Sequence, residues 1–122
     1  MVQSRTVVKV IDNTGVTFVR CISVLRGPRA MGSTGHTIVA SVRDTKGVSK
    51  IQKGDVVRAL IVRSKNEKAR YDGSWFIPGE SACVLVNATG NPIGTRIKGL
   101  VSKTLLKNRD NLKILTLATQ SV

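Results

Sequence analysis

The chain has 122 residues, of which 41% are hydrophobic, and a formal net charge of +13 at pH 7. This length predicts one domain, residues 1–122, and the composition is that of a globular protein and not of a disordered one. No apolar run approaches the roughly 18 residues of a membrane-spanning helix, and no basic amphipathic helix suits a membrane surface. The charge therefore predicts a nucleic acid as the partner, whose phosphates the cations neutralise.

Short β-branched segments separated by turn residues make up the first two thirds of the chain. Residues 6–12 and 16–25 flank the turn Asp12-Asn13-Thr14-Gly15 and predict a β-hairpin. The charged stretch 63–74 ends in Asp72-Gly73, a hairpin turn signal, and predicts a hairpin extension. Further strands are expected at 36–44, 56–62, 75–77 and 81–87.

The tail has a different character from the rest of the chain. Residues 100–119 contain good helix formers and no Gly or Pro, and their leucines predict two short helices broken near 108–111. The stretch 113–119 is also open to interpretation as a strand. Five or six short strands with Gly-rich turns, followed by helices, predict a mainly β protein built on a small closed or nearly closed barrel.

The positive charge is unevenly distributed along the chain. Residues 71–95 contain no Lys or Arg and carry a net charge of −2, whereas residues 43–70 carry +6 and residues 96–122 carry +5. The neutral stretch is expected inside the barrel or against a neutral neighbour. The electropositive surfaces are expected at the basic loops 26–29, 46–53 and 63–70.

The sequence assembles no recognisable catalytic, cofactor or metal site. Cys21 and Cys83 lack metal-ligand spacing and are interpreted as buried and reduced, although the residues leave open a single disulfide between them. His36 lies in a Gly/Ser/Thr loop, and nothing places a cysteine beside it. The carboxylates are scattered and mostly occupy turns, where they cap backbone amides; they are Asp12, Asp44, Asp55, Glu67, Asp72, Glu80 and Asp110.

The aromatic content indicates how RNA would be bound. One Trp, one Tyr and two Phe are few for a platform that stacks bases, so phosphate and sugar contacts to folded RNA are expected. Two other classes stay open. A free-standing RNA binder, acting as a translation regulator or chaperone, would carry more exposed aromatic side chains. A thiol enzyme would expose a reactive Cys21 or Cys83.

Six stretches in the same order as in one family are spread along almost the whole chain: "VIDNTG" (10–15), "QKGDVVRALIVRSK" (52–65), "YDGS" (71–74), "SACVLVN" (81–87), "NPIGTRI" (91–97) and "LKILTLAT" (112–119). With them the chain resembles the universal large-subunit ribosomal protein family conventionally numbered fourteen, in its bacterial or organellar form. The resemblance implies a five-stranded barrel with short C-terminal helices and a structural, non-enzymatic place in the large ribosomal subunit.

The resemblance also implies partners. They are large-subunit rRNA, ribosomal proteins three and nineteen, small-subunit rRNA at an intersubunit bridge, and a ribosome silencing factor that blocks subunit joining. The residues expected to bind rRNA are Lys9, Arg26, Arg29, Lys46, Lys50, Lys53, Arg63, Lys65, Lys68 and Arg70. Those expected at the subunit interface and the silencing-factor face are Thr95, Arg96, Lys98, Lys103 and Lys107.

The turn before Arg96 has a physical interpretation of its own. Pro92 and Gly94 restrict the backbone, so Arg96 is expected on a stiff mount that lowers the entropy lost on binding. Alternatively, the turn only reverses a strand, and Arg96 caps a helix end.

Some positions depart from the family pattern. Pro78 and Ser81 stand where the family usually has an aromatic residue and an Asn or Thr, and Gly35-His36 stands where bacterial members commonly have Gly-Asp. The loop 45–51 also differs from the usual family sequence. These departures favour an organellar ribosome, mitochondrial before plastid, over the bacterial cytoplasm.

Overall fold

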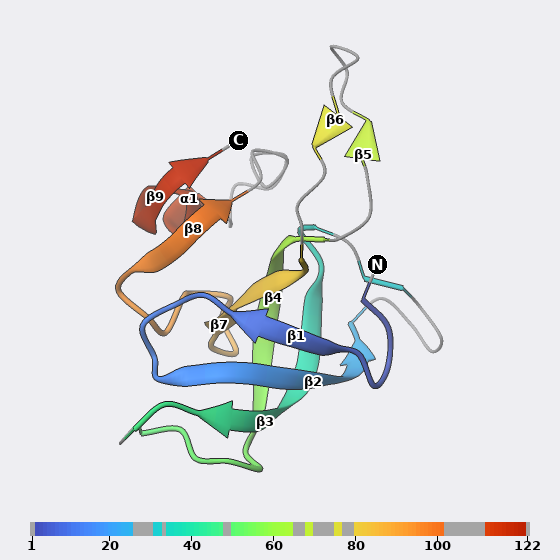
Figure 1. Cartoon of the computed structure of the whole chain (residues 1–122), viewed down its shortest axis with the longest axis vertical. Helices are drawn as coiled ribbons and strands as arrows, with labels where there is room; N and C mark the ends of the chain where they lie inside the picture. The colour runs from blue at the N-terminus through green and yellow to red at the C-terminus, as the bar shows by residue number, and fades with distance from the viewer. Residues whose placement is uncertain are drawn as a thin grey trace.

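Five strands close into a β-barrel in the computed structural model, which describes residues 2–25, 31, 32, 34–47, 50–64, 68, 69, 75, 76, 80–101 and 112–121. The barrel strands are β1 (Val7–Val10), β2 (Val16–Val24), β3 (Thr37–Thr45), β4 (Val56–Arg63) and β7 (Ala82–Val86). They follow one another around the wall, and β7 returns to β1 (Figure 1). The predicted mainly β, five-stranded barrel is confirmed.

The barrel is mixed because its closing pair is parallel, whereas the other four pairs of neighbours are antiparallel. Lys9 of β1 pairs with Ala82 of β7 across the closure. The antiparallel pairing of β1 with β2 confirms the predicted N-terminal hairpin. Closure leaves none of these five strands with an unpaired edge.

The barrel interior is filled mainly by branched aliphatic side chains. Val8, Val19, Ile38, Ile61 and Leu85, one from each barrel strand, have no solvent exposure. Branched side chains pack well on a pleated surface, and their burial is the main favourable contribution to folding. The β-branched segments of the sequence therefore form the wall of the barrel.

Strand β2 is apolar on both faces because it is bulged. Register shifts against β3 follow Val16, Phe18 and Cys21, and a bulge reverses the side to which the following residues point. Val16, Val19 and Cys21 are therefore buried although their positions do not alternate regularly, whereas Phe18 and Ile22 face the solvent. Sequence alternation alone does not predict this division.

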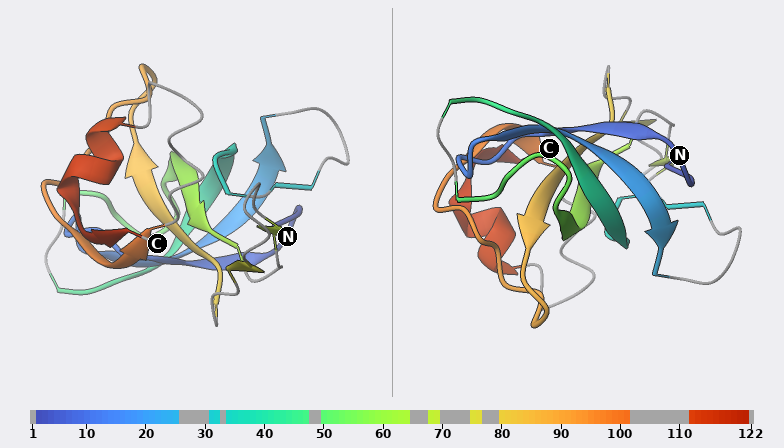
Figure 2. Two further views of the ribbon diagram at one scale, coloured as in Figure 1. Left: turned by 90° about the horizontal axis from the view of Figure 1, so that it is seen from above. Right: turned by 90° about the horizontal axis from the view of Figure 1, so that it is seen from below.

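A second core lies between the outer side of β4 and β7 and the C-terminal segment. This segment contains β8 (Ile97–Val101), the six-residue helical segment α1 (Leu112–Leu117) and β9 (Ala118–Ser121), with β8 and β9 paired in parallel. Figures 1 and 2 show these elements together on one side of the barrel. Ile114 of α1 is buried in this core with Val84 of β7. All five residues of β7 are buried because one of its faces lines each core.

The predicted helical segment over 100–119 is wrong at both ends. Residues 100–101 belong to β8 and residues 118–119 to β9. Helix propensity is a weak preference, and here the pairing of β8 with β9 and the burial of Ile97 and Val101 in the second core outweigh it. The second predicted helix, around 105–106, lies outside the described residues. Of the two predicted helices, the described residues contain one, the short α1, and the other stays a prediction.

The strands β5 (Lys68–Ala69) and β6 (Trp75–Phe76) form a separate antiparallel ladder. Figure 1 shows this ladder beyond one end of the barrel. The expected hairpin turn at Asp72-Gly73 falls between the two strands in the sequence and lies outside the described residues.

Candidate nucleic-acid interface

The turn between β1 and β2 is fastened to the neighbouring strand β7. One carboxylate oxygen of Asp12, Oδ2, accepts a hydrogen bond from the backbone N–H of Leu85 at 3.0 Å. The other, Oδ1, accepts from the backbone N–H and the hydroxyl of Thr14, at 3.2 and 2.6 Å. A short polar side chain that satisfies turn amides in this way holds the turn in one conformation.

Asn13 joins this turn to the segment that carries Arg96. Its Oδ1 accepts from the backbone N–H groups of Thr95 and Arg96, at 2.8 and 3.3 Å, and its Nδ2 donates to the Thr95 hydroxyl at 2.7 Å. A Cβ on Gly94 would lie 2.8 Å from Asn13 Oδ1, so the close approach requires glycine. Two of the motifs that define the resemblance therefore meet in space.

The other end of the same segment is also held. The Asn87 side-chain oxygen accepts from the backbone N–H groups of Thr89 and Asn91, at 3.1 and 2.9 Å. Lys113 of α1 donates from Nζ to Asn91 Oδ1 at 3.1 Å. The backbone N–H of Ile93 bonds to the carbonyl of Leu85 at 3.1 Å. The 87–96 segment is thus attached to the barrel, to the turn between β1 and β2, and to α1.

This arrangement presents the predicted interface residues to solvent. Thr95, Arg96 and Lys98 are exposed, and we call them the 95–98 face. The stiffness expected from Pro92 and Gly94 has a further source in Asn13, which the sequence indicates only as a turn residue. Two other residues expected on this face, Lys103 and Lys107, lie outside the described residues.

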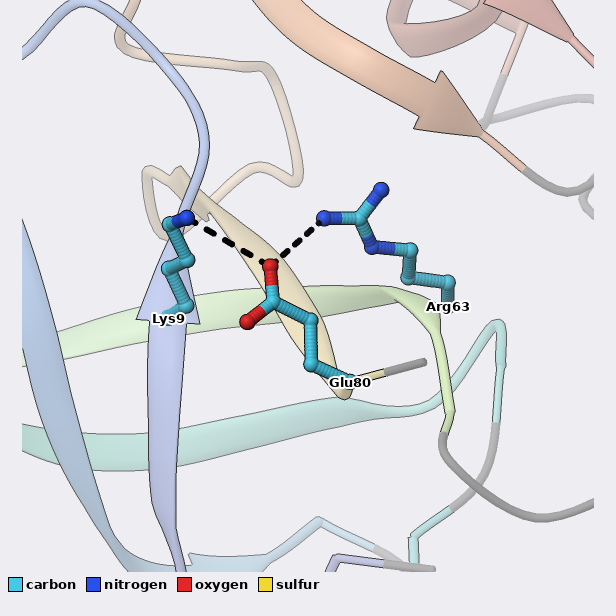
Figure 3. Close-up of polar contacts among 3 residues, drawn as sticks. All are labelled: Lys9, Arg63 and Glu80. Atoms are coloured by element: carbon cyan, nitrogen blue, oxygen red, sulfur yellow. Dashed lines mark hydrogen bonds and ion pairs between the residues drawn. The ribbon is translucent and has the colours of Figure 1, made fainter. Parts of the chain in front are cut away.

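Lys9 and Arg63 converge on one carboxylate (Figure 3). Lys9 Nζ lies 3.4 Å and Arg63 Nη2 lies 3.2 Å from the same oxygen of Glu80, Oε1. The side chain of Arg63 is only 14% exposed, against 48% for Lys9. A Cβ on Gly99 would lie 3.3 Å from Arg63 Nη1, so the backbone of β8 packs closely on the guanidinium. Arg63 therefore contributes to the contacts among β1, β4 and β8 as well as to the surface charge.

The remaining cations predicted to bind rRNA fall into two groups. Lys46, Lys50 and Lys53 are exposed in the connection between β3 and β4, and Lys68 belongs to β5. The others lie outside the described residues; they are Arg26, Arg29, Lys65 and Arg70. The structure brings Lys9 and Arg63 together, and Lys53 lines the same surface depression as Arg43 of β3.

Further cations lie on the outer wall of the barrel, and the sequence reasoning did not select them. Arg20 of β2, Arg43 of β3 and Arg58 of β4 are exposed. Each stands in a strand and not in a basic loop. Alternation with the buried Val19 and Val42 was the signal that could have identified Arg20 and Arg43 as outward-facing.

The cysteines are buried thiols in the barrel interior and form no disulfide. Burial raises the pKa of both thiols, and for Cys83 the neighbouring Asp12 carboxylate and Cys21 raise the pKa further. A nucleophilic cysteine needs a lowered pKa and an accessible sulfur. The environment of both thiols is the opposite of that requirement.

The described residues hold no group of three or more His, Cys, Asp and Glu side chains arranged for a metal ion. Among the described helices, none has the length and apolarity to cross a membrane. The backbone carbonyl of the half-buried His36 accepts a hydrogen bond from Ile61 at 3.0 Å, which joins the loop before β3 to β4.

The geometry combines a closed barrel, a cation-bearing outer wall and a fixed turn that presents arginine. A comparison with protein-family models matches the chain to "Ribosomal protein L14p/L23e", and the match extends over residues 1–122. The match includes both motifs joined by Asn13 and all five barrel strands. The chain therefore belongs to the L14p/L23e family of ribosomal proteins.

Proposed function

We propose that the protein uses two different surfaces in the ribosome. Membership of the family makes it a structural, rRNA-binding protein of the large subunit and not an enzyme. In the proposal, the exposed cations of the barrel and its loops neutralise phosphates of folded large-subunit rRNA. The 95–98 face meets the small subunit and forms an intersubunit bridge with its rRNA.

The single observation that carries this proposal is the attachment of Arg96. Its backbone and that of Thr95 are bonded to Asn13, while the residue itself is exposed. A guanidinium on a fixed backbone loses less conformational entropy on pairing with a phosphate or a carboxylate. A fixed backbone of this kind suits an intersubunit contact, which must form and break repeatedly with the same geometry.

Further partners belong to the same proposal. The family resemblance supports neighbours at ribosomal proteins three and nineteen and docking of a silencing factor on the 95–98 face. The departures at Pro78, Ser81 and Gly35-His36 support an organellar ribosome, with the mitochondrion first and the bacterial cytoplasm second.

Density-gradient sedimentation of a gentle lysate containing the tagged protein tests the ribosomal location. We expect the protein to travel with the large subunit and with joined ribosomes, and the accompanying rRNA identifies the compartment. A protein that stays at the top of the gradient, or that travels with messenger RNA, would instead be a free-standing RNA binder.

Two charge reversals separate the two surfaces. We expect Arg96→Glu to leave incorporation into large subunits intact but to lower the joined fraction or silencing-factor binding several-fold. Lys53→Glu, the matched reversal in the β3–β4 connection, is expected to lower incorporation instead. Large-subunit occupancy and the ratio of joined to free subunits are read from the same gradients. Loss of incorporation with Arg96→Glu would make Arg96 an assembly residue and contradict the division.

A further inference from the structure

The outer wall formed by β1, β2 and β3 contains an open depression of about 590 Å³, lined by Val7, Phe18, Arg43, Asp44 and Lys53. We propose that this depression binds one unpaired nucleotide of RNA, with the base against the Phe18 ring and the adjoining phosphates on the surrounding cations. The proposal deepens the proposed function, because it assigns a ligand to one part of the rRNA-binding surface.

The floor of the depression is apolar and exposed. Phe18 is 40% and Val7 is 39% exposed, and the two residues lie on the adjacent strands β2 and β1 of the barrel wall. Figure 1 shows β1, β2 and β3 side by side, and the bulge at Phe18 belongs to the pairing of β2 with β3. An aromatic ring held on a strand presents its face without the entropy cost of ordering a loop. Proteins that bind single-stranded RNA use such rings because every base has a π-face that can stack on them.

Cations surround this floor on several sides. Arg43 and Lys53 line the depression itself. Lys9 stands opposite Phe18 in the register of β1 with β2, and Arg20 stands opposite Val7. Both are exposed, and the ion pair of Lys9 with Glu80 leaves its side chain 48% exposed. A phosphate on either side of a stacked base therefore has a cation within the same patch.

Asp44 distinguishes a nucleotide from a bare anion as the ligand. Its Oδ1 accepts from the backbone N–H of Thr45 at 2.9 Å, and its Cα is paired with that of Phe18 across β2 and β3. A carboxylate in the middle of the patch repels phosphate, but it accepts hydrogen bonds from a base amino group or a ribose 2′-hydroxyl. The depression thus offers an apolar ring for a base, a carboxylate for the base or sugar edge and cations for the phosphates.

The charge around the depression favours RNA over a protein as its occupant. Protein–protein interfaces are depleted of charged residues at their centre, whereas this small apolar floor lies between Arg43, Lys53 and Asp44. The net charge of +13 points in the same direction. A partner protein covering Phe18 is therefore the competing result of the test.

Ultraviolet crosslinking of intact large subunits provides the first test, because a stacked ring forms an adduct with its base. Trypsin cleavage after Lys9 and Arg20 releases residues 10–20, which contain Phe18 as their only aromatic residue. We expect a nucleotide adduct on Phe18 in mass spectra of this peptide. An adduct confined to other peptides would overturn the proposal and leave a protein as the occupant of the depression.

Binding of the purified protein to deproteinised large-subunit rRNA provides the second test. Phe18→Leu keeps an apolar side chain but removes the ring, and loss of one stacked base predicts roughly 5- to 150-fold weaker binding. Phe18→Tyr keeps the ring and is expected to bind like the original protein. Ile22→Ala, an exposed apolar position on the same strand outside the depression, is the control.

The two results separate this inference from the proposed function. Equal binding by the Phe18→Leu and Phe18→Tyr variants would overturn the nucleotide site even if the protein sediments with large subunits. Failure to sediment with large subunits would contradict the proposed function, while the difference between these two variants would still decide the nucleotide site.

Discussion

Asn13 shows how much of this protein depends on single side chains that bridge distant segments. One amide group satisfies two backbone N–H groups and one hydroxyl in a segment that is 82 residues away along the chain. The neighbouring Asp12 does the same for Leu85 and Thr14. Together they convert a surface turn into a fixed support for Arg96.

Replacing Asn13 with alanine is expected to loosen this support. Three hydrogen bonds are lost at an exposed site, so we expect the free energy of unfolding to fall by about 1–2 kcal/mol. Urea unfolding measures this change, and amide hydrogen exchange at residues 94–96 measures the loosening directly. Thr95→Val, which removes only the hydroxyl partner, serves as the graded control with about 0.5–1 kcal/mol. Unchanged exchange in the Asn13→Ala protein would show that Pro92 and Gly94 alone fix the turn.

The barrel thiols give a prediction on pH. The pKa of Cys21 and that of Cys83 are raised above 9.0 by burial, so the folded protein retains thiol protons that the unfolded chain releases. Below about pH 9 both states are protonated and the thiols add no pH dependence. Above it, the unfolded state binds fewer protons, so stability is expected to fall as pH rises.

Two measurements test this assignment of the thiols. Denaturation midpoints between pH 8 and 10.5 should fall in the original protein and fall less steeply in a Cys21→Ala, Cys83→Ala double variant. Alkylation at pH 8 should proceed only at the rate of unfolding. Rapid labelling of either cysteine in the folded protein would contradict the burial and revive the thiol-enzyme alternative.

At the scale of elements, the sequence predicts the parts of the barrel that depend on local pattern. β-Branched runs and the turn 12–15 predict β1, β2, β3, β4 and β7 to within one or two residues. The strand β8 was missed, and β9 falls partly within the stretch 113–119, for which a strand was the alternative interpretation. Both depend on the pairing of β8 with β9, and Ile97 and Val101 of β8 are buried in the second core, which a leucine-rich tail does not reveal. The bulges of β2 were also missed, because they appear only in its pairing with β3 and have no local sequence signal.

The candidate site divides in the same way. Pro92 and Gly94 predict a stiff turn and an exposed Arg96, since both act on their own backbone. The role of Asn13 depends on a contact across the chain and has no local signal. Arg63 was predicted to face RNA, but its pairing with Glu80 and its close contact with Gly99 follow from the meeting of β4 and β8.

Ile114 of α1 is buried in the second core and attaches the C-terminal segment to the outer side of the barrel. We expect Ile114→Ala to lower the free energy of unfolding by about 2–5 kcal/mol, because it leaves a cavity against the barrel wall. Hydrogen exchange should rise first in β8 and β9. Thr116→Ala, at an exposed position of α1, should change stability by less than about 1 kcal/mol. Similar effects of the two variants would show that α1 is not anchored by Ile114.

At the scale of the whole molecule, charge and burial are separated. The neutral stretch predicted to lie inside is confirmed for β7, which is covered on both faces. The cations of the described residues lie on the outer wall and on the connections between strands, and two of them, Lys9 and Arg63, pair with Glu80. In this part of the surface, the Glu80 carboxylate offsets some of the positive charge that RNA would meet.

Removing the negative charge of Glu80 is expected to strengthen RNA binding. In Glu80→Gln, Lys9 and Arg63 no longer share a carboxylate, so affinity for deproteinised rRNA should rise and its salt dependence should steepen by about 1–2 units of slope. Stability should change by no more than about 1 kcal/mol, because Glu80 is half exposed. Filter binding over a range of salt concentrations measures both quantities.

Asp55→Asn is the matched control, since it removes one exposed carboxylate from the β3–β4 connection without separating an ion pair of the described residues. An equal rise in affinity for both variants would show that net charge alone determines binding, and that the Lys9–Glu80–Arg63 cluster has no particular role.

The parallel closure of the barrel has a consequence for how the protein is made. Asp12 and Leu85, which meet at the closure, are 73 residues apart, so at about 5–20 residues per second β1 emerges from a translating ribosome roughly 4–15 s before its second neighbour. During this interval one edge of β1 is open to pairing with other nascent chains. Delayed synthesis of β7 should therefore increase aggregation more than delayed synthesis of the tail.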